Sequence, residues 1–383
     1  MSSLVLFPSK PRVLEFFAGV GLARMGLEAA GFEVCWANDI EPDKREMYLT
    51  HYGDEGHFHL GDVHNVSVDK LPEQVDIAWA SSPCTDLSLA GNRSGLRGRE
   101  SSAFYGFTRV LEELGEHRPK VAVLENVVGL ATSHGGDDLA AAVRAFNELG
   151  YSVDVITIDA KRFVAQSRPR LFLIAAQNPP ASDLSDDSEL RPAWLQPIFS
   201  AANLRMHRAP IVAPPALRER GLGATLERLP DSDLRWWDAE RLENFTASMS
   251  PVQSARLNTL KKARSTTYRT AYRRTRNGVA VWEMRPDDIA GCLRTARGGS
   301  SKQAVVRLGN GKIAARWMTG REYARLMGAG DYNLNGLRDS QVHFAFGDAV
   351  AVPVVQWLAE NYLMPLIKGR FDSNIYLEGE AVV

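Results

Sequence analysis

The sequence predicts an α/β fold: a doubly wound, mostly parallel sheet joined to a smaller, irregular domain. Two observations indicate this. Between residues 12 and about 178, short apolar segments with strand character alternate with segments of helical spacing. After Gln177 the chain is rich in Pro, Ser and Asp, and no βα alternation is evident between about 190 and 315. At 383 residues, the chain is long enough for two such units.

Six apolar segments are expected to form the strands of the sheet. They are residues 12–17, 33–38, 75–80, 120–125, 151–159 and 171–176. Helical spacing is expected to produce helices over residues 22–30, 103–117 and 138–149. From Thr319 the helical periodicity returns, and residues 346–363 are expected to form a loop that opens a helix.

Composition excludes several classes of protein. An apolar content of 45% and a charged content of 24% are typical of a soluble globular protein. We expect no apolar stretch to be long enough to cross a membrane, and the first residues lack the layout of a signal peptide. The three cysteines, Cys35, Cys84 and Cys292, lie far apart without a CxxC pair. This spacing argues against disulfides and a zinc site, and it favours a reducing cytoplasm and no bound metal.

A glycine-rich turn, FAGVG at residues 17–21, follows the first expected strand and precedes the first helix. Such a turn lets the backbone approach a ligand beside a helix N-terminus. The GxG pattern is shared by binders of NAD, FAD and other nucleotides. Arg24 stands where the dinucleotide fingerprint has its third glycine, which disfavours a dehydrogenase.

Two acidic residues complete a predicted adenosine pocket. Asp39 ends the second strand and is placed to bind ribose hydroxyls. Asp62, in the sequence Gly-Asp-Val, can accept a hydrogen bond from an adenine amino group. Either acid alone is more typical of a surface or helix-capping residue, so the prediction depends on their combination with the glycine turn.

Cys84 is the candidate nucleophile. It follows Pro83 at the end of a buried apolar strand, where open α/β sheets bind ligands. The alternative is a buried structural cysteine. Glu125 ends the next strand, where burial of an acid is costly unless it has a function. Arg168 and Arg170, spaced two apart, are able to hold a base, a phosphate or Glu125.

Two further segments favour a nucleic-acid substrate. Residues 256–276 hold eight Lys or Arg and no acid, with tyrosines and threonines among them. Residues 91–102 hold three glycines and three arginines. The alternatives are a solvated basic face for the first segment and an ordinary surface loop for the second.

Six motifs in a fixed order resemble those of the DNA (cytosine-5)-methyltransferase family. They are FAGVG, SPCTDLSLAG, ENV, QSRPR, GREYARLMG and GDAV. The resemblance is to the bacterial or phage type found in restriction-modification or defence systems. It implies a catalytic and cofactor-binding domain over 1–180 and a target-recognition domain over 181–318. A return segment over 319–383 would pack its C-terminal helix on the catalytic domain.

The resemblance implies a reaction with S-adenosylmethionine on double-stranded DNA. It also implies that residues 91–102 form the family's mobile loop, which closes over the DNA and excludes water. The Cys84 thiolate would attack carbon 6 of a flipped-out cytosine, and Glu125 would bind ring nitrogen 3 and the exocyclic amine. Arg170 and Arg168 would contact the cytosine carbonyl and order Glu125. The implied cofactor residues are Phe17, Gly19, Val20, Gly21, Asp39, Ile40, Asp62, Val63, Pro83, Asp348 and Ala349. The candidate DNA-binding residues are Ser88, Arg93, Arg97, Arg264, Arg269, Arg273, Arg274 and Arg276.

Some positions depart from the commonest family pattern. Thr85 follows the cysteine where Gln is usual, Leu22 replaces a frequent glycine, and Asp348 replaces Asn. Ile40 is a reasonable substitute for the bulky side chain that often packs on adenine. Three alternatives stay open at this point: an RNA cytosine-5 methyltransferase, a non-catalytic DNA-binding relative and a nucleotide-dependent dehydrogenase. The enzyme is expected to be monomeric, with a restriction or defence component as a possible companion.

Overall fold

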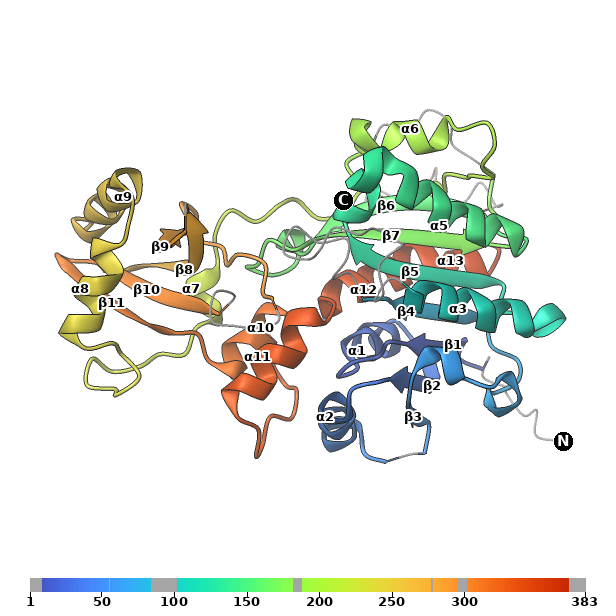
Figure 1. Ribbon diagram of the computed structural model, residues 1–383, viewed down its shortest axis with the longest axis horizontal. Helices are drawn as coiled ribbons and strands as arrows, with labels where there is room; N and C mark the ends of the chain where they lie inside the picture. The colour runs from blue at the N-terminus through green and yellow to red at the C-terminus, as the bar shows by residue number, and fades with distance from the viewer. Residues whose placement is uncertain are drawn as a thin grey trace, which may run out of the picture.

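The computed structural model describes residues 9–54, 56–83, 102–181, 188–276, 278–294 and 302–371. It has two lobes, each built around its own sheet (Figure 1). The larger lobe holds a seven-stranded sheet with the order β3-β2-β1-β4-β5-β7-β6. The smaller lobe holds a four-stranded antiparallel sheet with the order β11-β10-β8-β9.

The large sheet confirms the predicted fold class. Its strands are β1 (Arg12–Phe16), β2 (Glu33–Asp39), β3 (Phe58–Leu60), β4 (Ile77–Ser81), β5 (Val121–Val127), β6 (Ser152–Asp159) and β7 (Pro169–Ala176). The pairs from β3 through β5 are parallel, and β7 runs antiparallel to β5 and β6. The strand order changes direction between β1 and β4. The carboxyl ends of these two strands therefore form the switch point where such sheets bind ligands.

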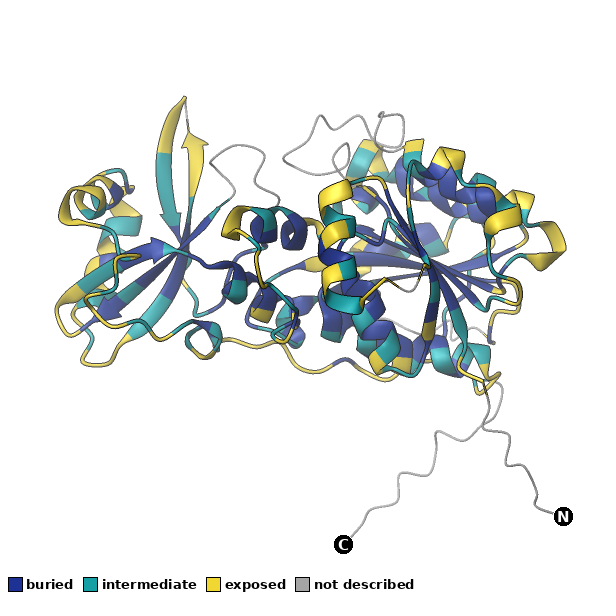
Figure 2. Ribbon diagram, turned by 90° about the horizontal axis from the view of Figure 1, so that it is seen from below, coloured by how far each residue is buried: buried dark blue, intermediate teal, exposed yellow. Residues whose placement is uncertain are grey.

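Helices cover both faces of this sheet (Figures 1 and 2). They include α1 (Leu22–Ala29), α2 (Pro42–Tyr52), α3 (Ser102–Glu113), α4 (Gly129–Thr132) and α5 (Asp137–Glu148). Because strand residues alternate between faces, Ile77 and Trp79 of β4 enter one core and Ala78 and Ala80 enter the other. The second core also contains Phe107 of α3.

Helix α2 and strand β3 were not predicted from the sequence. Only Met47 and Tyr48 of α2 are buried, so its apolar residues have little periodicity. Strand β3 is three residues long and pairs with the end of β2. Neither element carries enough apolar pattern to be recognised without its neighbours.

The smaller lobe combines short helices with the second sheet. These elements are α7 (Leu222–Thr225), α8 (Ala239–Ala247), α9 (Pro251–Lys261), β8 (Thr267–Arg276), β9 (Val279–Met284), β10 (Gln303–Gly309) and β11 (Lys312–Trp317). Helix α6 (Gln196–Phe199), which precedes them in the chain, packs on the larger lobe (Figure 1). Half-buried Trp237, Trp282 and Trp317 pack with Phe245 beside this sheet. The hairpin of β8 and β9 projects from the lobe, and its tip is exposed (Figure 2).

The chain then returns to the large lobe. The returning helices are α10 (Gly320–Leu326), α11 (Asp339–Asp348), α12 (Val352–Leu358) and α13 (Met364–Ile367). Helix α12 packs against α1, and a Cβ added at Gly26 of α1 would lie 2.7 Å from the carbonyl oxygen of Val352. The predicted loop at residues 346–363 is partly wrong, because Phe346, Gly347 and Asp348 belong to α11.

The expectation that no apolar stretch is long enough to cross a membrane needs correction. The helical stretch Asp339–Ile367 is long and apolar enough by length and composition. Its apolar window is, however, 72% buried inside the fold. The apolar character of this stretch is explained by its place in the core.

Candidate active site

The glycine-rich turn lies at the carboxyl end of β1. Phe17, Gly19 and Gly21 all have positive φ angles, of 57°, 57° and 77°. The amide of Ala18 donates to the carbonyl of Asn38 at 2.8 Å, which ties the turn to β2. A Cβ at Gly21 would lie 2.5 Å from a ring carbon of Tyr52, so this position requires glycine. The turn is thus fixed closely enough to present its backbone to a ligand.

Asp39 holds this turn in place. Its Oδ2 atom accepts a hydrogen bond from the amide of Gly19 at 2.8 Å, and its Oδ1 accepts from the amide of Glu41 at 2.9 Å. The residue is buried, whereas the side chain that follows it, Ile40, is 59% exposed. A buried acid next to an exposed apolar side chain can accept hydroxyl hydrogen bonds while the isoleucine packs on a flat ring.

Asp62 and Val63 follow β3 on the same side of the sheet. The amide of Gly61 donates to the Asp39 carbonyl at 2.9 Å, which joins the two segments. Asp62 Oδ1 accepts from the amide of His64 at 2.9 Å and so caps a short helical turn. Val63 is buried. The capping role of Asp62 does not prevent the predicted contact with adenine, because a carboxylate can accept several hydrogen bonds at once.

Arg24 explains the missing third glycine. Its guanidinium packs over the ring of Tyr52 at 4.2 Å and pairs with Glu28 at 2.7 Å. The hydroxyl of Tyr52 in turn donates to the carbonyl of Gly21 at 2.5 Å. Arg24 therefore supports the residues beneath the turn, in the space that a dinucleotide fingerprint keeps open with glycine.

Glu125 lies near the carboxyl end of β5, beside Ser81 of β4 in the parallel register. Its Oε1 atom lies 2.9 Å from Nε of Arg170. Burial raises the pKa of Glu125 above its ordinary value, and the positive charges of Arg170 and Arg168 offset part of this increase. A carboxyl group in this setting is suited to donate a proton to a ligand above the sheet.

Arg168 and Arg170 have different environments, although the sequence assigned both to catalysis. Arg168 is 1% exposed and donates to the carbonyls of Leu293, at 2.8 Å, and Gly347, at 3.0 Å. It also donates to the carbonyl of Ala349. Through these contacts Arg168 joins three segments of the chain, whereas the Arg170 guanidinium contacts Glu125.

Asn126 and Cys292 were not among the predicted site residues. The Asn126 amide donates to Oγ of Ser82 at 3.0 Å, at the end of β4 where Pro83 follows. Its place directly after Glu125 in the ENV motif is the signal that could have identified it. Cys292 Sγ lies 3.4 Å from Nη1 of Arg168. No sequence signal links Cys292 to this site, because it is remote from the other motifs.

Several predicted residues lie outside the described part of the chain: Cys84, Ser88, Arg93 and Arg97. Pro83, the residue before Cys84, is described and exposed. Asp348 is exposed and pairs with Lys44 at 3.3 Å. Across the described ranges, no group of three or more His, Cys, Asp or Glu could hold a metal ion.

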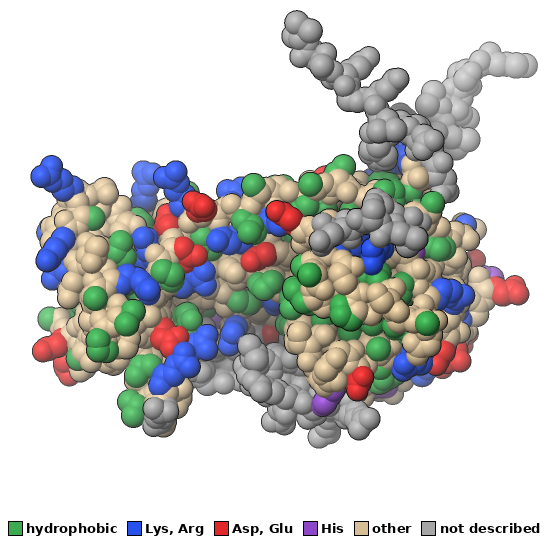
Figure 3. All heavy atoms as spheres, turned by 90° about the horizontal axis from the view of Figure 1, so that it is seen from above, with side chains coloured by type: hydrophobic (Ala, Val, Ile, Leu, Met, Phe, Trp, Pro, Cys, Tyr) green, Lys and Arg blue, Asp and Glu red, His purple; other side chains and the backbone are tan. Residues whose placement is uncertain are grey.

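The candidate DNA-binding arginines of the small lobe differ in exposure. Arg264 and Arg273 are exposed. Arg274 and Arg276 both pair with Glu283, at 3.1 Å and 2.6 Å. Arg269 is buried, and its guanidinium donates to the carbonyls of Pro286 and Tyr268. Arg269 therefore stabilises the lobe, and other Lys and Arg side chains remain on its surface (Figure 3).

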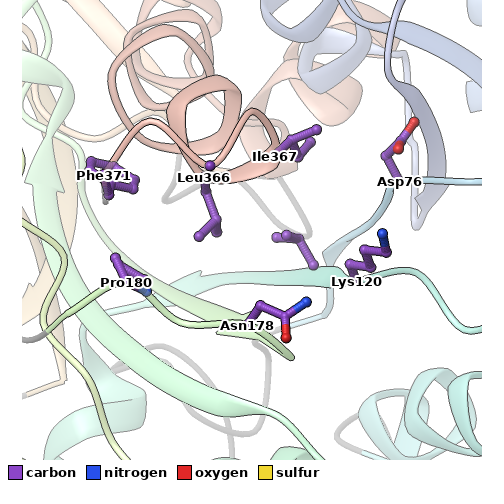
Figure 4. A pocket seen from close by; sticks show the side chains of 9 residues that line it. Asp76, Lys120, Asn178, Pro180, Leu366, Ile367 and Phe371 are labelled. Atoms are coloured by element: carbon purple, nitrogen blue, oxygen red, sulfur yellow. The ribbon is translucent and has the colours of Figure 1, made fainter. Parts of the chain in front are cut away.

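A cavity of about 220 Å³ lies at the opposite end of the large sheet (Figure 4). Asp76 and Lys120, which precede β4 and β5, line it together with Leu366 and Phe371. The amino ends of parallel strands are not where such sheets bind ligands, so this cavity is separate from the candidate site.

Comparisons with known proteins agree with this arrangement. Residues 11–363 match the family model for C-5 cytosine-specific DNA methylase. The chain is 25% identical over 355 residues to the Type II methyltransferase M.HhaI of Haemophilus parahaemolyticus, covering 91% of this chain and 93% of that protein. It is 32% identical over 168 residues to the orphan methyltransferase M.SPRI of Bacillus phage SPR, covering 43% and 37%. The crystal structure of the S. pombe Dnmt2 methyltransferase matches with a TM-score of 0.60 at 18% identity, covering 93% and 99%, and shares the fold.

Proposed function

The chain belongs to the C-5 cytosine-specific DNA methylase family, and we propose that it methylates carbon 5 of a flipped-out cytosine through a covalent adduct at Cys84. The enzyme is a DNA (cytosine-5)-methyltransferase. The contact between the buried Glu125 and Arg170, next to the strand that leads to Pro83, is the observation that supports this mechanism.

The cofactor of this reaction is proposed to be S-adenosylmethionine. The fit is supported by the turn at Gly19, the buried Asp39 and the exposed Ile40, which suit a glycine-rich backbone contact, a ribose and an adenine. Phe17, Val20, Gly21, Asp62 and Val63 complete this proposed pocket. When bound, S-adenosylmethionine supplies the methyl group that carbon 5 receives.

Cys84, Glu125 and Arg170 are proposed to carry out the other steps of the reaction. The Cys84 thiolate forms a bond to carbon 6, and Glu125 donates a proton to ring nitrogen 3, so that negative charge does not build up on the ring. Arg170 orients Glu125 and contacts the cytosine carbonyl. After transfer, a water molecule takes the proton from carbon 5, the carbon–sulfur bond breaks to release the Cys84 thiolate, and the proton on ring nitrogen 3 returns to Glu125, which restores the aromatic base.

A labelling experiment tests this mechanism. With duplex DNA and S-adenosylmethionine labelled in the methyl group, Cys84→Ser should lose nearly all transfer, while the matched control Cys35→Ser should keep it. DNA containing 5-fluorocytosine should trap a covalent complex with the wild type, because the fluorine at carbon 5 cannot leave as a proton. Undiminished transfer by Cys84→Ser would remove this residue from the mechanism, and parallel assays on transfer RNA would show any RNA activity.

The wider assignments are also proposals. We divide the chain into a catalytic domain over 1–180, a target-recognition domain over 181–318 and a return segment over 319–383. Ser88, Arg93, Arg97, Arg264, Arg273, Arg274 and Arg276 are proposed to contact the DNA. The enzyme is proposed to be a cytoplasmic monomer of a restriction-modification or phage system, since M.HhaI is named a Type II methyltransferase and M.SPRI an orphan phage enzyme.

A further inference from the structure

Lys44 and Asp348 form an ion pair between segments 304 residues apart. Lys44 lies in α2 and Asp348 ends α11. The Lys44 Nζ atom is 3.3 Å from Oδ2 of Asp348, and it lies 5.7 Å from the centre of the Phe344 ring. The pair therefore occupies a defined place between two helices.

This pair is close to the glycine-rich turn. A Cβ built on Gly19 would lie 3.9 Å from Cδ of Lys44, so the lysine stem passes over the turn. The backbone on either side of Asp348 is held by Arg168, which donates to the carbonyls of Gly347 and Ala349. Both members of the pair are thus attached to elements that the active site already fixes.

The hydrogen-bonding capacity of Lys44 is not used up by Asp348. A lysine ammonium has three N–H donors, and Asp348 is the only hydrogen-bonding partner of Lys44 among the described residues. The Lys44 side chain is 12% exposed and that of Asp348 is 47% exposed. A largely buried ammonium with spare donors is favourable when a second anion binds beside it.

We propose that the Lys44–Asp348 pair binds the amino acid end of S-adenosylmethionine, with Lys44 contacting the α-carboxylate and Asp348 the α-ammonium. This inference depends on the proposed function, which supplies the cofactor. The two charges of the ligand sit on one carbon atom, and the pair presents opposite charges at a similar spacing. Asp348 alone would repel the α-carboxylate, and Lys44 removes that repulsion.

Calorimetric titration with four ligands tests the assignment: S-adenosylmethionine, S-adenosylhomocysteine, adenosine and decarboxylated S-adenosylmethionine. Lys44→Met should weaken binding of the first two about 10-fold to 100-fold, as expected for a charged hydrogen bond. It should leave the affinity for adenosine and for the decarboxylated ligand unchanged, because neither has the carboxylate. Asp348→Asn should also lower the affinity for the decarboxylated ligand, since that ligand keeps its ammonium group.

Lys312→Met, at an exposed position that begins β11 in the small lobe, is the matched control and should bind all four ligands like the wild type. If Lys44→Met lowers the affinity for adenosine as much as that for S-adenosylmethionine, the pair only supports the fold of the turn and the inference is wrong. Unchanged binding of S-adenosylmethionine would also overturn it. Failure of the wild-type protein to bind S-adenosylmethionine would instead overturn the proposed function. Thermal unfolding of each variant separates these outcomes from misfolding.

Discussion

The Nε atom of Arg170 lies 2.9 Å from Oε1 of Glu125, where β7 runs antiparallel to β5. The two side chains are only 13% and 6% exposed, so water does little to screen the contact. Arg170 orients the carboxyl group and at the same time lowers its pKa, against the larger effect of burial. The position of one guanidinium thus controls both the direction and the protonation of the proposed proton donor.

The pH dependence of methyl transfer follows from this pair. Since only the protonated Glu125 can donate, activity should fall as pH rises through its raised pKa. Arg170→Gln removes a charge that lowers this pKa, so the fall should move to higher pH while the maximal rate decreases. Glu125→Gln should lower kcat by about 10²–10⁴-fold and abolish this part of the profile. Single-turnover rates measured across the pH range check these expectations; a profile for Arg170→Gln that moves to lower pH would contradict them.

Substitution of Arg168 should mainly lower stability, whereas substitution of Arg170 should mainly lower the rate of methyl transfer. Arg168→Met leaves buried carbonyls of Leu293, Gly347 and Ala349 without their donor, and should cost about 3 kcal/mol of unfolding free energy. Arg170→Met should cost less stability, because Glu125, whose pKa is already raised by burial, can remain neutral without the arginine, and should mainly reduce kcat. Urea unfolding and methyl-transfer kinetics on both variants make the comparison. The assignment of roles fails if Arg168→Met is as stable as the wild type.

Glu15 should make stability depend on pH. Burial raises the pKa of this carboxyl to about 8 from an ordinary value of 4.5. The folded protein then binds a proton that the unfolded chain has lost, so this contribution is complete below about pH 4.5 and has been lost once pH exceeds about 8. Glu15→Gln should flatten this decline. The decline is measured by comparing the free energy of unfolding near neutral pH with that above pH 8. If this free energy falls equally with pH in the wild type and in Glu15→Gln, Glu15 is not the cause.

The sequence predicted the parts of the structure that depend on local pattern. The sequence predicted six strands and named Glu125 as one of three groups that Arg168 and Arg170 could hold. Their contact depends on β7 running antiparallel to β5, which puts the start of β7 beside the carboxyl end of β5. The contacts of Arg168 with Leu293, Gly347 and Ala349 were not predicted, because Arg168 precedes β7 (Pro169–Ala176) and these partners are remote in the sequence. The pairing of Lys44 with Asp348 depends on helices that are remote in the sequence, and no local pattern reveals it.

In the basic segment, residues 256–276, the sequence also could not show which side chains are buried. Its arginines look alike in the sequence, since nearly every residue of β8 is polar. In the structure Arg269 is 9% exposed and donates to backbone carbonyls, whereas Arg273 is exposed on the projecting β8–β9 hairpin. Charge composition therefore located the segment, and only the fold distinguishes the arginines available to DNA from those that stabilise the lobe.

The β8–β9 hairpin should contribute to DNA affinity through its charge. Each substitution of Arg273, Arg274 or Arg276 by Ala should weaken binding of all duplex sequences and reduce the slope of log affinity against log salt by about 1. Glu283→Gln should have the opposite effect, because it removes the acid that pairs with Arg274 and Arg276 and leaves their charges free for phosphates. Arg235→Ala, an exposed arginine of the same lobe that pairs with Asp233, is the control and should change neither quantity. Fluorescence anisotropy at several salt concentrations measures affinity and slope together. If Glu283→Gln weakens DNA binding instead, Glu283 itself contacts a base or orders the hairpin. The purely electrostatic role assigned to the β8–β9 hairpin is then wrong.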